Sequence, residues 1–301
     1  MKHTQRLIGL SFGWTVLAVV LLIVLVGPAS NADTFVLTNG SSTATYDNAN
    51  GFTDYTVNYQ YNQRDLLTQQ QFWYRIGSSG PESSIGSLTL VKNNLSDTKG
   101  PNNGLPDGYY DTINSVYTNA SSKFSITLTS TLTGYASPSD ARDSGLGSTI
   151  KIYNGSSSTL ALHLFLYSDF NLGPSPTETV WFPNSTTVYQ SNSVAFPDGA
   201  NLQTVETPQS GPTPTVSEET GLSPSILDSL TDGSPTTLSG TNMLTGDATW
   251  AFEWDVNIGA GLSEQISLNN LLFVPEPSSL MLGLSGLLLL AVTLRRARRV
   301  G

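Results

Sequence analysis

The segment Trp250–Ile258 alternates strictly along its length. Its five even-numbered residues are apolar, and the residues between them are small, acidic or amide. Because successive side chains of a β-strand point to opposite faces of a sheet, a period of two predicts a strand with one buried face. Phe124–Leu132 alternates apolar and hydroxyl residues in the same way. Leu160–Tyr167 is apolar on one face and aromatic or small on the other, which predicts a central strand covered on both sides.

Similar short patterns recur along the chain, between clusters of Gly, Pro, Asn and Asp. About ten strands so spaced favour an all-β fold, a β-sandwich, with the jelly roll among the arrangements considered. Gly259–Gly261 predicts a tight hairpin between two of them. The further strand candidates are Thr34–Leu37, Tyr55–Tyr61, Gln71–Ile76, Ser87–Val91, Tyr109–Val116, Ser148–Tyr153, Thr186–Gln190 and Gln265–Leu272.

One region departs from this rhythm. Residues 197–247 are rich in Pro, Thr, Ser, Gly and acids, which predicts a long loop within the β domain. Pro224–Leu230 could form one short helical turn inside it. With no internal repeat, we expect residues 33–273 to form one domain.

The charge distribution excludes some classes of function. Only 12% of the 301 residues are charged, against roughly 25% in soluble domains, so hydroxyl and amide side chains must supply the polar surface. With 7 basic and 22 acidic residues between Asp33 and Pro275, the middle of the chain carries a net charge near −15. Such a domain repels phosphate backbones, so we expect no nucleic-acid partner. The absence of cysteine excludes disulfides, thiolate metal sites and a cysteine nucleophile.

The N-terminal segment has the features of an export signal. Lys2 and Arg6 precede the apolar stretch Leu7–Val26, which ends at Gly27 and Pro28. Small residues at Ser30 and Ala32 match the positions that signal peptidase requires. We predict that residues 1–32 are a signal peptide, cleaved between Ala32 and Asp33; an uncleaved membrane anchor is the alternative.

The C-terminal segment has three parts in a fixed order. Pro275-Glu276-Pro277 precedes the apolar stretch Leu280–Leu294, and a basic cluster follows, made of Arg295, Arg296, Arg298 and Arg299. A helix of these 15 apolar residues would be roughly 22 Å long at about 1.5 Å per residue, and a bilayer span needs about 20 residues. Residues 277–279 and snorkelling arginines could supply the missing length. The arginines should stay cytoplasmic, which places residues 33–275 on the outer side of the membrane.

This order of motif, short helix and arginine cluster resembles the PEP-CTERM sorting signal of Gram-negative bacteria. A plain C-terminal membrane anchor is the competing interpretation. The resemblance covers residues 274–299 and implies processing by an exosortase-like membrane enzyme, in bacteria that make exopolysaccharide and biofilm matrix. It implies a membrane-anchored precursor with a periplasmic domain, delivered later to the cell surface or matrix. Lys151–Phe170 and Trp250–Gly261 also resemble uncharacterised ectodomains that carry this signal, which implies an all-β exported domain with no assigned activity.

Residues able to do chemistry are few. His163 is the one histidine outside the signal peptide, and no Gly-x-Ser-x-Gly nucleophile motif accompanies it. A zinc site needs several His or Cys ligands, so none is expected. Glu253 and Asp255 project from one face of a strand, about 7 Å apart, as a glycosidase carboxylate pair could. A solvated outer face of a core strand is the alternative we favour, so we expect no catalytic site.

Other side chains suggest binding. Trp73 and Trp181 are candidates for stacking on sugar rings, whereas Trp250 and Trp254 share a face with Phe252 and should pack in the core. No cofactor is expected. A structural calcium ion is the alternative considered, because aspartates lie in or beside predicted turns at Asp107, Asp111, Asp140, Asp143 and Asp169.

Taken together, these features predict an exported, non-catalytic protein of the cell surface or extracellular matrix. Its expected partners are signal peptidase, an exosortase-like enzyme and exopolysaccharide. The alternative is a carbohydrate-active enzyme, or a carbohydrate-binding module, that acts on matrix polysaccharide.

Overall fold

A computed structural model describes residues 33–59, 62–98, 100, 105–135, 143–192, 194, 202–213 and 216–273. The predicted signal peptide, with Ala32, and the predicted sorting segment 274–299 lie outside these residues, as does Asp140. Within the described ranges, no helix is both long and apolar enough to cross a bilayer.

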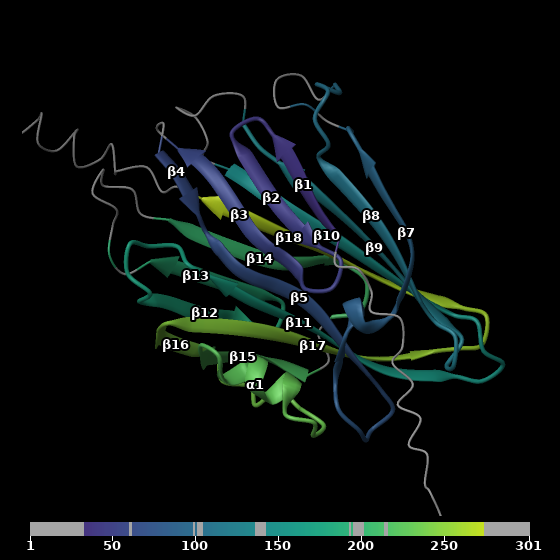
Figure 1. The fold of residues 1–301 in the computed structure, drawn as a ribbon. Coiled ribbons are helices and arrows are strands. Elements are labelled where there is room, and N and C mark those ends of the chain that lie inside the picture. Colours follow the sequence, from purple (N-terminus) through teal and green to yellow (C-terminus); the bar gives the residue numbers. More distant parts are fainter. Residues whose placement is uncertain are drawn as a thin grey trace, which may run out of the picture.

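Two nine-stranded antiparallel sheets form the fold (Figure 1). Sheet A runs in the order β1 (Thr34–Asn39), β2 (Ser42–Asp47), β3 (Gly51–Tyr59), β5 (Leu67–Ile76), β11 (Leu160–Phe170), β17 (Ala248–Ile258) and β15 (Val216–Leu222). Two short strands extend it, β4 (Asn62–Asp65) beside β3 and β6 (Ser83–Ser84) beside β5. This architecture confirms the predicted all-β sandwich.

Sheet B runs in the order β16 (Met243–Gly246), β12 (Glu178–Asn184), β13 (Thr187–Asn192), β14 (Gln203–Ser210), β18 (Ser263–Phe273), β10 (Asp143–Asn154), β9 (Phe124–Thr133), β8 (Thr112–Asn119) and β7 (Thr89–Ser96). A single 3₁₀ turn, η1 (Ile85–Ser87), and a short helix, α1 (Ser225–Thr231), complete the described elements. The helix matches the helical turn expected at Pro224–Leu230.

The core lies between the sheets and is rich in aromatic rings. The even-numbered residues of β17 are buried there, as their alternation predicts. Trp250 and Phe252 meet edge to face with ring centroids 5.6 Å apart, and Phe252 meets Phe182 of sheet B at 5.5 Å. Such contacts between aromatic rings of both sheets add to the stabilisation that burial of their apolar surface provides.

A second, smaller cluster covers the outer face of sheet A. Phe165 and Tyr167 of β11 pack there against Ile226 and Leu230 of α1, and against Leu238. Strand β11 is therefore covered on both faces, as predicted for Leu160–Tyr167.

Residues 197–247, predicted to be a loop, contain β14, β15, α1 and β16. The prediction failed at β14 because the residues that this strand points inward are polar, so the strand lacks apolar alternation. Thr204 and Glu206 are both buried, and the Thr204 hydroxyl donates a 2.8 Å hydrogen bond to Asn270 of the neighbouring strand. Pro208 is accommodated next to an irregularity in the β14–β18 ladder.

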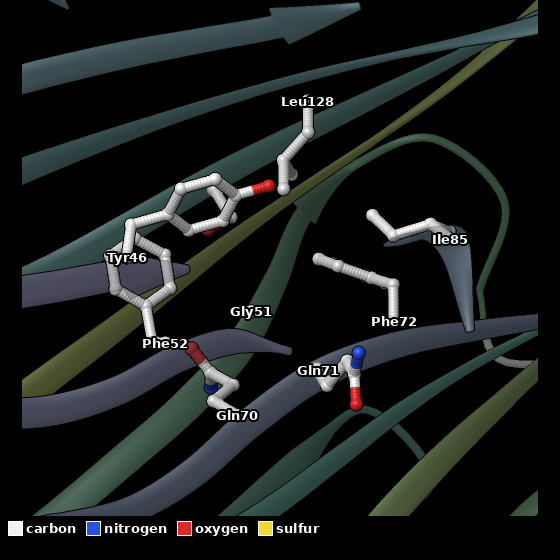
Figure 2. A pocket seen from close by; sticks show the side chains of 9 residues that line it. Tyr46, Gly51, Phe52, Gln70, Gln71, Phe72, Ile85 and Leu128 are labelled. Carbon is white, nitrogen blue, oxygen red and sulfur yellow. The ribbon is translucent and has the colours of Figure 1, made fainter. Parts of the chain in front are cut away.

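Between the sheets lies a cavity of about 10 Å³, shown in Figure 2. The side chains of Tyr46, Phe72, Ile85 and Leu128 turn toward it. This volume is roughly what one water molecule requires, so the cavity is too small to hold a sugar or a cofactor.

Candidate functional site

The outer face of sheet A brings charged side chains from three adjacent strands into one row. Arg75 of β5 pairs with His163 of β11, which in turn pairs with Asp255 of β17. The next row along the same strands contains Trp73, Phe165 and Glu253. Odd-numbered residues of β11 and β17 face outward, because the even-numbered ones fill the core.

His163 lies against two carboxylates. Its Nδ1 atom is 3.3 Å from Oε1 of Glu253 and is also in contact with Oδ1 of Asp255. The side chains of His163 and Asp255 are 20% and 33% exposed, whereas that of Glu253 is 1% exposed. Solvent therefore reaches the side chains of His163 and Asp255, whereas the carboxyl of Glu253 is shielded from it.

The buried carboxyl of Glu253 is held from two sides. Its Oε2 accepts a 3.0 Å hydrogen bond from the backbone N–H of Leu238, and its Oε1 faces His163. Burial raises the pKa of Glu253, the Leu238 bond opposes this rise, and the charge of Asp255 adds to it. The expectation that Glu253 lies on a solvated face was wrong, because the segment that follows α1 covers it.

That segment, residues 235–242, is called the strap here. Carboxylates hold its backbone at three points: the N–H groups of Thr236, Leu238 and Ser239 donate to Glu82, Glu253 and Glu219 at 2.8, 3.0 and 2.7 Å. Leu238 is its one buried side chain. The strap thus depends on a few polar contacts and one apolar anchor.

A buried ion pair lies beside the strap. Arg75 contacts Glu82, and its Nη1 also donates a 2.6 Å hydrogen bond to the carbonyl of Thr236. The guanidinium sits 5.8 Å from the ring centroid of Phe165, within the range of a cation–π contact. Sequence reasoning missed Arg75 and Glu82, although an arginine at an outward position of a predicted strand was a usable signal.

The arrangement suits proton transfer. When Nδ1 of a histidine donates to a carboxylate, the ring is held in one orientation and Nε2 is left with a lone pair that can accept a proton. His163, Glu253 and Asp255 also offer one nitrogen and two oxygen atoms, all within 4.8 Å of one another. Those donors could hold a metal ion that accepts mixed nitrogen and oxygen ligands.

The other predicted site residues lie apart from one another. Trp73 is partly buried against the outer cluster of sheet A, near the His163 group. Trp181 is on sheet B, and one face of its indole is stacked on Tyr189, with centroids 5.0 Å apart. Sugar stacking at Trp73 and Trp181 stays a prediction.

Among the predicted calcium ligands, Asp111 is buried and accepts hydrogen bonds from Thr98, and Asp107 accepts one from the N–H of Tyr109. Asp169 lies elsewhere, near the end of β11. Asp143 begins β10.

No family model matches the chain, and no curated protein matches it in sequence. Among solved structures, a bacterial glucoamylase complexed with acarbose is similar, with a TM-score of 0.51 and 11% identity. The match covers 87% of this chain and 36% of the glucoamylase, so the chain spans about a third of that protein. This chain shares its fold with the matched part of the glucoamylase.

Two further solved structures are similar with TM-scores below that of the glucoamylase. A putative aldose 1-epimerase from Escherichia coli K12 has a TM-score of 0.45 and 11% identity, over 80% of this chain and 99% of the epimerase. A protein from Synechocystis sp. PCC 6803 has a TM-score of 0.48 and 9% identity, over 82% of this chain and 99% of its own.

The expectation of a non-catalytic protein is corrected by these findings. It rested on an isolated His163 and on solvent-exposed carboxylates at Glu253 and Asp255. The structure instead groups the three side chains, and the fold that carries them also occurs in a carbohydrate-active enzyme. Strand pairing brings the group together, and the sequence alone did not contain that pairing.

Proposed function

We propose that this chain is a carbohydrate-active enzyme in which His163, oriented by Glu253 and Asp255, transfers protons to and from a sugar. The contact of the His163 Nδ1 atom with both carboxylates carries this proposal. The β-sandwich shared with a glucoamylase that binds acarbose supports the class of substrate.

Each member of the group has a separate role. The two carboxylates accept hydrogen bonds from the Nδ1–H group, which stays on the ring, and they stabilise the imidazolium that forms when Nε2 takes up a proton. Glu253 is fixed by the backbone of Leu238, so it acts as the rigid member. Asp255 is more exposed and lies nearer to an incoming substrate.

The test is an activity screen with matched variants. The purified protein is incubated with α-glucans, matrix exopolysaccharide and reducing sugars, and the products are followed by NMR and mass spectrometry. We expect turnover by the parent and by the control Asp228→Asn, an exposed carboxylate on α1. His163→Ala and Glu253→Gln should each lower the rate by about 10²–10⁴-fold, the usual contribution of a positioned acid or base. Unchanged turnover by His163→Ala, or no turnover of any of these sugars, would reject the proposal.

We also propose that the chain is exported and sorted by a PEP-CTERM system toward the cell surface or matrix. The signal-like residues 1–32 and the motif Pro275-Glu276-Pro277, followed by an apolar stretch and four arginines, support this. Signal peptidase and an exosortase-like enzyme would process the two ends. Matrix exopolysaccharide is then the substrate that the enzyme would meet.

Intact mass spectrometry of the native protein tests the sorting proposal. We expect a mature chain that begins at Asp33 and ends near the motif, and a processing defect when Pro275, Glu276 and Pro277 are replaced by alanine. A mature protein that still ends at Gly301 contradicts it.

A further inference from the structure

Two glycines in the left-handed backbone region lie before and within the strap. Gly233 precedes it with a φ of +84°, and Gly240 lies inside it with a φ of +76°. Glycine adopts such angles at little cost, and loops that open over active sites often turn on glycines. Apart from its chain neighbours, no described atom lies within 4 Å of the position that a Cβ on Gly233 would take. The backbone therefore has room to turn there.

Between these glycines, the strap is held to sheet A through its backbone. The N–H groups of Thr236, Leu238 and Ser239 donate to carboxylates, and the carbonyl of Thr236 accepts from Arg75. The strap thus contributes peptide groups to these bonds, and the sheet contributes charged side chains. A ligand that both donates and accepts hydrogen bonds can take the place of peptide groups, and each hydroxyl of a sugar does both.

The part of the strap that follows Gly240 is attached in another way. The carbonyls of Thr241 and Asn242 accept 2.9 and 2.8 Å hydrogen bonds from the backbone N–H groups of Thr220 in β15 and Phe182 in β12. These bonds join the strap to the backbone of both sheets. The part before Gly240 can therefore lift while the part after it stays in place.

The surface under the strap contains aromatic rings and polar atoms without partners. Trp73 and Phe165 belong to the same outer cluster as Leu238. Among the described residues, Nε1 of Trp73 and Oε2 of Glu82 are buried and have no hydrogen-bond partner. A buried polar atom without a partner is costly, so this surface has hydrogen-bonding capacity that the closed strap does not use. Rings combined with a few polar groups are typical of small-molecule sites.

This surface adjoins the proposed catalytic group. Trp73, Phe165 and Glu253 form the row next to His163 on the outer face of sheet A. Successive rows on one face of a sheet are about 7 Å apart, twice the rise per residue, so a sugar that reaches His163 also lies beside this row. With 1% of its side chain exposed, Glu253 is out of reach of a sugar while the strap is closed.

We propose that Trp73, Arg75, Glu82 and Glu253 form a sugar-binding subsite, and that the part of the strap before Gly240 is a lid that opens to admit the sugar. The class of ligand rests on the proposed function, whereas the opening of the strap does not. In the closed state, the peptide groups of the strap occupy the places of sugar hydroxyls. The apparent affinity for a sugar is then reduced by the fraction of molecules whose strap is open.

Hydrogen exchange of the full chain without sugar tests the lid. We expect the amides of residues 236, 238 and 239 and the indole N–H of Trp73 to exchange through one shared opening, while the β-sandwich stays folded. Amides of β17, measured in the same sample, report global unfolding. If the strap amides exchange only at the rate of those in β17, or if the indole of Trp73 does not share their opening, the strap is no lid and the proposal is overturned.

A loosened strap tests the subsite. Leu238→Ala removes the apolar anchor and raises the open fraction, so KM for a sugar that the activity screen identifies should fall by about tenfold, although the variant is less stable. A purely structural role predicts no gain in apparent affinity. Asp228→Asn, on exposed α1, is the control and should keep the parent KM. Leu238→Val is a milder change that should fold and should shift KM in the same direction.

The lid and the proposed function can fail separately. Turnover with an unchanged or raised KM in both Leu238 variants overturns the subsite and leaves the proposed function intact. No turnover of any sugar rejects the proposed function and the sugar subsite with it. The exchange of the strap amides and of the Trp73 indole then still decides whether the strap opens.

Discussion

The Nδ1 atom of His163 lies 3.3 Å from Oε1 of Glu253, although 90 residues separate the two in the chain. The antiparallel pairing of β11 with β17 creates this proximity. Because Glu253 is buried and the strap covers it, its contacts contribute to stability as well as to the proposed chemistry.

Replacement of Glu253 by glutamine should separate these two contributions. Glutamine keeps an oxygen that can accept the Leu238 N–H, so Glu253→Gln should fold with nearly the parent stability. Glu253→Ala leaves that N–H without a partner in a buried place and should cost about 1–3 kcal/mol. Urea denaturation at pH 7 measures the difference. Equal losses for the two variants would show that the Leu238 contact is unimportant.

The apolar anchor of the strap gives a second prediction. Leu238 packs with Phe165 and Tyr167, and its removal should destabilise the protein by about 2–4 kcal/mol. Amide hydrogen exchange at residues 236–239 should also become faster in Leu238→Ala, since the strap loses its buried side chain. Thr237→Ala, at an exposed neighbouring position, is the control. Unaltered exchange in Leu238→Ala would show that the carboxylate contacts hold the strap unaided.

The core acid Glu206 predicts a pH dependence of stability. Its Oε2 accepts 2.9 Å hydrogen bonds from Gln70 and Asn270, and burial raises its pKa from an ordinary 4.5 to about 7. The native state therefore keeps a proton that the unfolded state releases, so stability falls as pH rises from 4.5 to 7. The loss amounts to about 3 kcal/mol, from roughly 1.4 kcal/mol for each unit of pKa difference.

Glu206→Gln should remove that contribution. The variant should match the parent near pH 4.5 and exceed its stability above pH 7. Raised pKa values at Glu178 and Asp169 act in the same direction in both proteins, so the difference between the two pH profiles isolates Glu206. Parallel profiles, measured by urea denaturation from pH 4.5 to 8, would contradict this assignment.

Gly51, at the start of β3, offers a steric test. Its φ is +78°, and a Cβ atom there would lie 2.4 Å from the carbonyl oxygen of Gln70. Gly77 has a similar φ of +69° but open space around it. Gly77→Ala should therefore cost about 1 kcal/mol for the backbone alone, and Gly51→Ala should cost clearly more. Comparable midpoints of thermal unfolding would mean that β3 shifts freely away from β5.

The sequence predicted those strands whose buried faces are made of apolar residues. Strands β9 and β17 alternate between apolar and polar residues, and β11 is apolar on one face and aromatic or small on the other; each was predicted within a few residues of its observed bounds. Strand β14 was missed because its inward residues Thr204 and Glu206 are polar. Both form hydrogen bonds with the side chain of Asn270 on β18. A polar residue in a core gives no periodic signal, so composition suggested a loop.

The candidate site was predictable only in part, as the pair Glu253 and Asp255 on one strand and a separate His163. His163, Glu253 and Asp255 were each noticed, but their grouping depends on which strands are neighbours. The burial of Glu253 depends in turn on the strap, which has no regular secondary structure.

Strand β18, the last strand among the described residues, lies inside a sheet, with β14 on one side and β10 on the other. A nascent polypeptide therefore cannot complete sheet B until synthesis has reached Phe273, the end of β18. Until then β10 and β14 lack the neighbour that joins them, and the β-sandwich stays incomplete. If the chain is exported unfolded, as proposed above, such a delay keeps it competent for translocation, and the sheets form only after it has crossed the membrane.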